Sequence, residues 1–144
     1  KIEKDNIPAF ADAFEEHAAE HITDEQVISH IDIDSECRIS DLDESTVRQL
    51  NLLEPFGQGN PKPVFATKGV HRISPPRRVG MKGDHLQIAI SDNTASVRCI
   101  GFNMGKLEKK LLEADRFSVV YEPDLNTYNG RTSVQFVLTD IRFD

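Results

Sequence analysis

Basic side chains gather in one short part of the chain. Six of them, and no acidic residue, fall within the twenty-one residues from Lys62 to Lys82. Lys and Arg bind phosphate groups, and a segment with one sign of charge favours a polyanionic partner such as a nucleic acid. The candidate phosphate-binding residues are Lys68, Arg72, Arg77, Arg78, Lys82 and, further along the chain, Arg98. The alternative is an ordinary solvated charged surface.

Flat side chains that could stack on nucleobases are few. The sequence has no Trp, so the candidates are Tyr128, in a predicted loop, and His85, at the start of a predicted strand. Tyr128 could instead pack on a hairpin as a turn residue, and we expect Phe102 to lie in the core. Single-strand binding combines cations along the phosphates with rings that stack on bases. With so few rings, we expect a site that contacts mainly the backbone and has little sequence preference.

The sequence shows no residues with the spacing of a catalytic site. It contains no phosphate-binding loop ending in Lys-Ser/Thr and no Gly-x-Ser-x-Gly motif. His17 and His21 have the i, i+4 spacing that can bind a metal on a helix, but a solvated helix end is the favoured interpretation because no third ligand accompanies them. Asp32, Asp34 and Glu36 could hold a divalent cation, yet they lack the pattern of a calcium loop. We therefore predict neither catalytic residues nor a metal site.

Short β-strands in the second half must position the candidate residues. Alternating apolar residues predict strands at 64–73, 86–90, 96–102, 117–121 and 131–143. A short helix capped by Asn103 is predicted between the third and fourth strands, and Asn129-Gly130 predicts a hairpin turn. Residues 74–84 are predicted to form a basic loop or strand extension, and residues 123–130 a second loop.

This order of elements is that of an OB-fold, a five-stranded Greek-key barrel. An SH3-like barrel would not place a helix between the third and fourth strands. We therefore predict a mainly β chain with helices, of the α+β class, in which the barrel follows a small segment of helices and a strand. OB-folds commonly bind nucleic acid across strands two and three and the flanking loops, here 74–84 and 123–130.

The first part of the chain is acidic and predicted to be largely helical. Residues 1–54 have 4 Lys and Arg against 15 Asp and Glu, giving −11, whereas residues 55–144 have 13 against 9, giving +4. Asn6 and Pro8 predict the start of a helix, with Ile7, Phe10 and Phe14 on one face. A strand at 27–33 and a helix at 42–52 follow. We therefore predict two parts, 1–54 and 55–144.

A stiff connector joins the two parts. It reads Leu-Glu-Pro-Phe-Gly-Gln-Gly-Asn-Pro-Lys-Pro-Val-Phe at residues 53–65, and its prolines restrict the backbone while its glycines permit tight turns. This stretch resembles the signature near the C-terminal part of bacterial RecJ-type single-stranded-DNA exonucleases. The motif itself need only turn the chain and pack its aromatic rings, because Pro, Gly and Phe carry no acid–base chemistry.

The resemblance extends over most of the chain. Residues 6–10 resemble the end of a DHHA1 domain, and residues 85–86, 101–104, 129–131 and 140–142 resemble the OB domain of the RecJ family. The resemblance implies a fragment that is not itself an enzyme but holds single-stranded DNA for a 5′-3′ exonuclease, a hydrolase of DNA repair and recombination. The DHH catalytic domain, with Mg²⁺ or Mn²⁺, would lie upstream. Implied partners are single-stranded DNA, the upstream DHH and DHHA1 domains, and a single-strand-binding or other repair protein.

Composition favours a cytoplasmic protein without a membrane segment. Of 144 residues, 38 % are apolar and 28 % charged, and no apolar run approaches the roughly 20 residues that span a bilayer. Cys37 and Cys99 are far apart, which fits a reducing compartment, and we expect Cys99 to be buried. The start at Lys1 suggests a piece of a longer protein. A protein-docking module that contacts a repair partner or the enzyme core is the competing interpretation, and an autonomous hydrolase is the weakest.

Overall fold

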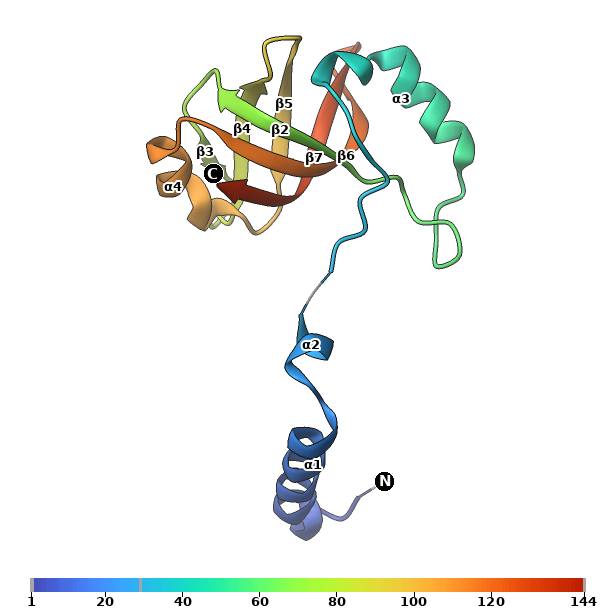
Figure 1. Ribbon diagram of the computed structural model, residues 1–144, viewed down its shortest axis with the longest axis vertical. Coiled ribbons are helices and arrows are strands. Elements are labelled where there is room, and N and C mark those ends of the chain that lie inside the picture. The colour runs from blue at the N-terminus through green and yellow to red at the C-terminus, as the bar shows by residue number, and fades with distance from the viewer. Residues whose placement is uncertain (1, 29, 144) are drawn as a thin grey trace. The chain divides into compact units, whose positions relative to one another are not determined.

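The computed structural model describes residues 2–28 and 30–143 (Figure 1). The chain contains two compact units, residues 1–31 and 32–144. The predicted division at residue 54 stays a prediction, although residues 32–54 belong to the second unit. Among the described residues, no helix is both long and apolar enough to cross a membrane.

The first unit is helical. A 3-10 turn (Lys4–Asn6) leads into α1 (Ile7–His21), and α2 (Asp24–Val27) follows. The helix predicted to hold Pro8 in its first turn is confirmed. The prediction that Asn6 caps it is wrong, because the backbone of Asn6 is already helical and its side chain accepts no capping hydrogen bond. The Phe10 and Phe14 rings stack at 5.9 Å, and both side chains are exposed.

The predicted strand at 27–33 is wrong for the residues that the structure describes. Val27 ends α2, whose first turn is held by the backbone N–H of Thr23, which donates to Oε1 of Gln26 at 3.0 Å. Ser29 lies outside the described residues, and residues 30–34 have no strand structure. Strand pairing begins at β1 (Ser35–Glu36), which runs parallel to β2. A local capping interaction thus prevails over an alternating apolar pattern.

Short helices in residues 39–53 cover part of the barrel. They are η2 (Ile39–Asp41), α3 (Glu44–Leu50) and η3 (Asn51–Leu53). The predicted helix at 42–52 is confirmed, and it begins where the Asp43 carboxylate accepts a backbone N–H from the first turn of α3. Ile39, Leu42 and Val47 are buried, and the first two belong to the barrel core.

Five strands close into a ring. They are β2 (Phe65–Arg72), β4 (His85–Ser91), β5 (Ser96–Gly101), β6 (Phe117–Tyr128) and β7 (Arg131–Phe143). Their order is β2-β6-β7-β5-β4, and pairing of β4 with β2 completes the ring, with β5 and β7 parallel. Two short helices, η4 (Gly105–Leu107) and α4 (Glu108–Glu113), connect β5 to β6. The predicted OB-fold is confirmed, and its five strands are labelled in Figure 1. β1 and β3 (Arg77–Val79) extend the sheet at its two edges.

The core fills the inside of the ring. Side chains alternate between the two faces of β4, and those of Leu86, Ile88 and Ile90 point inward and are buried. The rings of Tyr121 and Phe136 stack at 3.8 Å across β6 and β7. Cys99 is fully buried, as predicted, and burial raises the pKa of its thiol.

The fourth barrel strand is longer than predicted. Residues 123–130 do not form a loop, because β6 continues to Tyr128 and only Asn129 and Gly130 turn the chain, with φ of 49° and 75°. The predicted Asn-Gly turn is confirmed. Pro123 is compatible with the strand since β6 pairs with β7 alone beyond Tyr121, so a missing N–H can face the unpaired edge. The result is a long β6–β7 hairpin.

Candidate nucleic-acid interface

The outward face of β3, β4 and β5 carries two arginines and a glutamine in two rows of paired residues. Strand pairing sets Arg77 of β3 opposite Gln87 of β4, and Ala89 of β4 opposite Arg98 of β5. Because paired residues share a face and the β4 residues between these are buried, all four side chains lie on the outside of the barrel. The two rows are one pleat repeat apart, about 7 Å along the strands.

This face is hollowed along the rows. One hollow, of about 320 Å³, is lined by Arg77 and Arg98 among others. A second, of about 980 Å³, shares Gln87 and Arg98 with the first and reaches the β6–β7 hairpin at Tyr128 and Arg131. We call the two hollows together the groove. It runs from β3 across the outer face to the end of the hairpin.

The groove is positively charged although the chain as a whole is acidic. Three arginines line it, Arg77, Arg98 and Arg131, and none of its described lining residues is acidic. The chain has a net charge of −7. A concave surface of one sign attracts ligands of the opposite charge and raises their local concentration. The remaining lining side chains are small, amide, hydroxyl or apolar groups, which suit hydrogen bonding and contact with flat rings.

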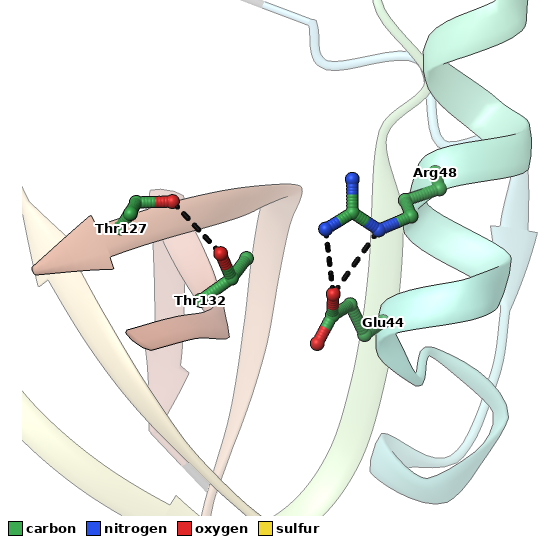
Figure 2. Close-up of polar contacts among 4 residues, drawn as sticks. All are labelled: Glu44, Arg48, Thr127 and Thr132. Atoms are coloured by element: carbon green, nitrogen blue, oxygen red, sulfur yellow. Dashed lines mark hydrogen bonds and ion pairs between the residues drawn. The ribbon is translucent and has the colours of Figure 1, made fainter. Parts of the chain in front are cut away.

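The hairpin end of the groove combines a ring with a cation. Tyr128 is 73 % exposed and pairs directly across the turn with Arg131. The next pair back, Thr127 and Thr132, joins the two strands through hydroxyl groups 2.9 Å apart (Figure 2). Tyr128 is thus an exposed ring on a hydrogen-bonded support, as a stacking residue requires, although its role stays a prediction.

Two of the predicted phosphate-binding residues lie away from the groove. Lys68 forms an ion pair with Glu36 at 2.5 Å, between β2 and β1. The Arg72 guanidinium donates to the backbone carbonyls of Leu111 and Ala114 at the end of α4. Both cations therefore have partners within the chain, and neither lines the groove.

Two others lie in β3 and in the turn that follows it. Arg78 is exposed and its Nε donates to the carbonyl of Gly83 at 2.7 Å. Lys82 is exposed in the turn between β3 and β4, where Gly80 and Gly83 have positive φ, which favours glycine. These side chains are close in sequence to Arg77 but do not line the groove. The structure thus brings Arg77, Arg98 and Tyr128 together and separates them from the rest of the predicted set.

His85 is enclosed by its neighbours. Its Nδ1 accepts the backbone N–H of Asn103 at 3.2 Å, and its ring meets that of Phe102 edge-on at 5.2 Å. Two predictions are wrong here. Phe102 is not in the core but 56 % exposed, and Asn103 does not cap a helix, because it sits at φ 59° in the turn that follows β5.

Sequence reasoning missed several residues of the groove. Arg131 was missed because the predicted binding loop, residues 123–130, ended one residue before it. The residue directly follows the Asn-Gly turn and pairs with Tyr128. The signal for Gln87 was available, since it lies between the inward Leu86 and Ile88. Ser74 comes next to a Pro-Pro pair and had no distinguishing pattern.

No side-chain arrangement in the described residues suits metal binding. Groups of three or more His, Cys, Asp or Glu that could hold an ion are absent from that part of the chain. The Cys37 thiol lies 3.5 Å from the Tyr121 hydroxyl, and burial together with nearby carboxylates raises its pKa despite this hydrogen bond. A raised pKa disfavours the thiolate that nucleophilic chemistry needs.

Comparison with known proteins identifies relatives of the whole chain. A family model described as the RecJ OB domain matches residues 33–140. The single-stranded-DNA-specific exonuclease RecJ of Bacillus subtilis (strain 168) is 28 % identical over 140 residues, which are 96 % of this chain and 18 % of the relative. Crystal structures of RecJ from Thermus thermophilus with Mn²⁺ and with Mg²⁺ give TM-scores of 0.77 and 0.72, at 25 % and 24 % identity. The matches cover 99 % of this chain but 20 % and 21 % of those structures, so the chain spans about a fifth of these relatives.

Proposed function

Because the chain belongs to the RecJ OB domain family, we propose that its groove binds single-stranded DNA. The observation that carries the proposal is that Arg77, Arg98 and Arg131 line the two adjoining hollows of the groove, and that the exposed ring of Tyr128 lines the second of them. Cations would contact the phosphates while the ring stacks on a base. With one ring at the hairpin end and three arginines, binding is dominated by the backbone and little dependent on sequence.

The proposal extends to the longer protein. The Bacillus subtilis relative is named a single-stranded-DNA-specific exonuclease, and this chain spans less than a fifth of it. We propose that the chain is the strand-holding part of such a 5′-3′ exonuclease, used in DNA repair and recombination in the cytoplasm. Metal-dependent cleavage, with Mg²⁺ or Mn²⁺, would then be performed by other domains, and the chain alone should not cleave single strands when Mn²⁺ is added.

The test is the binding of a fluorescent dT oligonucleotide, measured by anisotropy over a range of salt concentrations. The wild-type chain should bind at low salt, with affinity that falls as salt rises. In the double variant Arg77→Glu/Arg98→Glu, affinity should fall at least tenfold, and the slope of log K against log salt should become smaller by about 1.4, or 0.7 for each lost phosphate contact.

A matched control reverses two charges outside the groove. Lys68→Glu/Lys109→Glu changes net charge equally, but Lys68 pairs with Glu36 and Lys109 is exposed on α4. This control should bind much more tightly than the groove variant. Equal loss in both variants would mean that only overall charge matters, and no binding by the wild type at low salt would refute the proposed function.

A docking role is the second candidate. Ile7, Phe10 and Phe14 are exposed on α1 by 50 %, 57 % and 63 %, which is the kind of apolar stripe that packs against another protein surface. The partner could be the DHH and DHHA1 domains of the longer chain or a single-strand-binding or other repair protein. Retention of a partner by a variant that no longer binds oligonucleotides, and its loss in Phe10→Ser/Phe14→Ser, would support this role.

A further inference from the structure

We propose that Phe102 is a second base-stacking platform, at the opposite end of the outer face from Tyr128, and that His85 holds it in position. The ligand is a nucleobase of the strand whose phosphates the groove arginines bind, so this inference rests on the proposed function. Phe102 does not line the groove; it lies beyond the row of Arg77 and Gln87.

The position of Phe102 follows from strand register. Gly101, the last residue of β5, pairs with the buried Leu86, and Phe102 follows it in the turn. The exposed Phe102 ring lies against the ring of His85, which faces outward on β4. His85 is in turn two residues along β4 from Gln87 and four from Ala89, the partner of Arg98. The row of His85, against which the Phe102 ring lies, is therefore about 7 Å from the Arg77 row and about 14 Å from the Arg98 row along the strands. A strand held by both arginines can place a base on this ring.

The backbone that carries Phe102 is fixed on both sides. A Cβ on Gly101 would come within 2.7 Å of the Met104 sulfur, and one on Gly105 within 2.5 Å of the Gly83 carbonyl oxygen. The Gly105 N–H also donates to the carbonyl of Asp84 at 2.8 Å. Because this turn is already held in one conformation, binding of a base would cost little conformational entropy, and this favours affinity.

His85 supports the ring from the side. It presents its edge to Phe102 and accepts the Asn103 N–H at Nδ1, so one imidazole contacts both the ring and the backbone next to it. The other side of the imidazole is closed by Gly80, where an added Cβ would be 2.9 Å from His85 Cδ2. This enclosure makes His85 a positioning residue rather than a stacking surface of its own.

The charged residues near Phe102 give no reason for its exposure. Lys82 and Asp84, in the neighbouring turn, are both exposed, and their opposite charges add to zero. An exposed ring that is rigidly held and covers no core gives the fold little, whereas stacking on a base is a strong and sequence-tolerant contribution to single-strand binding. Stacking adds affinity without releasing counterions, and this separates it from the contribution of the arginines.

The experiment compares two ligands of equal length, a dT oligonucleotide and a chain of abasic residues, by anisotropy over a salt series. Phe102→Ala should weaken binding of the dT oligonucleotide roughly 5- to 150-fold, the range for loss of one stacked base. The slope of log K against log salt should not change, and binding of the abasic chain should be nearly unaffected. Phe102→Trp should retain affinity, whereas Phe102→Leu, which keeps an apolar side chain, should lose most of it.

His85→Ala should give a smaller loss than Phe102→Ala, again confined to the dT ligand, and should add nothing in the double variant. If Phe102→Ala binds dT as the wild type does, or weakens both ligands equally, the platform does not exist. That result is distinct from failure of the proposed function, in which the wild type binds neither ligand or Arg77→Glu/Arg98→Glu binds normally. Thermal unfolding of each variant shows that the fold is intact, as the exposure of Phe102 leads us to expect.

Discussion

Two arginines five residues apart in the sequence, Arg72 and Arg77, end in different regions of the molecule. Arg72, in β2, donates to carbonyls at the end of α4, and Arg116 likewise donates to the carbonyl of Gly69 at 2.6 Å. Arg77, in β3, lies in the groove with Arg98. Arg72 and Arg116 thus satisfy backbone carbonyls, whereas Arg77 and Arg98 are available to an external ligand. A cluster of cations in a sequence is therefore a weak guide to a binding site until the carbonyls that need donors are known.

The largest expected effect comes from removing the arginine that donates to backbone carbonyls. Arg72→Met should destabilise the fold by about 2 to 4 kcal/mol, because two carbonyls at the end of α4 lose a charged donor. Oligonucleotide affinity of the folded variant should stay near that of the wild type. Urea unfolding measures the first quantity and anisotropy the second.

Arg77→Met is the matched control for that measurement. Its side chain is exposed, so stability should change by no more than about 0.5 kcal/mol while oligonucleotide affinity falls. If Arg72→Met kept wild-type stability and lost as much oligonucleotide affinity as Arg77→Met, the distinction between an arginine that holds the fold and one that binds DNA would be refuted.

An acidic counterpart of Arg72 sharpens the same contrast. Asp92, in the β4–β5 turn, accepts the backbone N–H of Ile39, at 2.9 Å, and those of Thr94 and Ala95. Burial alone would raise the pKa of its carboxyl, but the hydrogen bonds from the Thr94 hydroxyl and from these N–H groups outweigh it and lower the pKa to about 2. This carboxylate joins the segment before α3 to the barrel.

The pH dependence of stability follows from that lowered pKa. A carboxyl whose pKa is lower in the folded state stabilises the fold fully above its unfolded value of about 4, and this stabilisation is lost as the pH falls towards 2. Because solvent still reaches this carboxyl, Asp92→Asn should lower stability by only about 0.5 to 1.5 kcal/mol at pH 7, and it should flatten stability between pH 4 and 2. Asp140→Asn, at an exposed carboxyl, should leave stability at pH 7 unchanged. Identical acid profiles for wild type and Asp92→Asn would refute the assignment. Urea unfolding across that pH range measures both.

The barrel was predictable from sequence because its signals are local. Alternation predicts β2, β4 and β5 nearly to the residue, and Asn129-Gly130 predicts the hairpin turn. The prediction of a strand at 27–33 was wrong because Val27 belongs to a capped helical turn. The full length of β6 was not predicted because Pro123 is typical of a strand end. The site was harder, since Arg72 and Phe102 depend on contacts distant in sequence: the end of α4 for one and the imidazole of His85 for the other.

The smallest expected effect comes from two variants that show whether the β6–β7 hairpin contributes to oligonucleotide binding or only to the stability of the fold. Thr132→Val removes the hydroxyl contact to Thr127 beside Tyr128 and keeps the side-chain shape (Figure 2). Glu44→Gln weakens the exposed ion pair with Arg48 on α3, a helix whose residues do not line the groove. Each should change stability by no more than about 0.5 kcal/mol.

Oligonucleotide affinity distinguishes the two variants. Thr132→Val should weaken binding about twofold, because a looser hairpin holds Tyr128 and Arg131 less firmly over the groove, whereas Glu44→Gln should leave it unchanged. Anisotropy titrations at one low salt concentration resolve a twofold change. An equal response of both variants would assign the hairpin to the scaffold, and the binding region would then be limited to the face of β3, β4 and β5, where Arg77 and Arg98 lie.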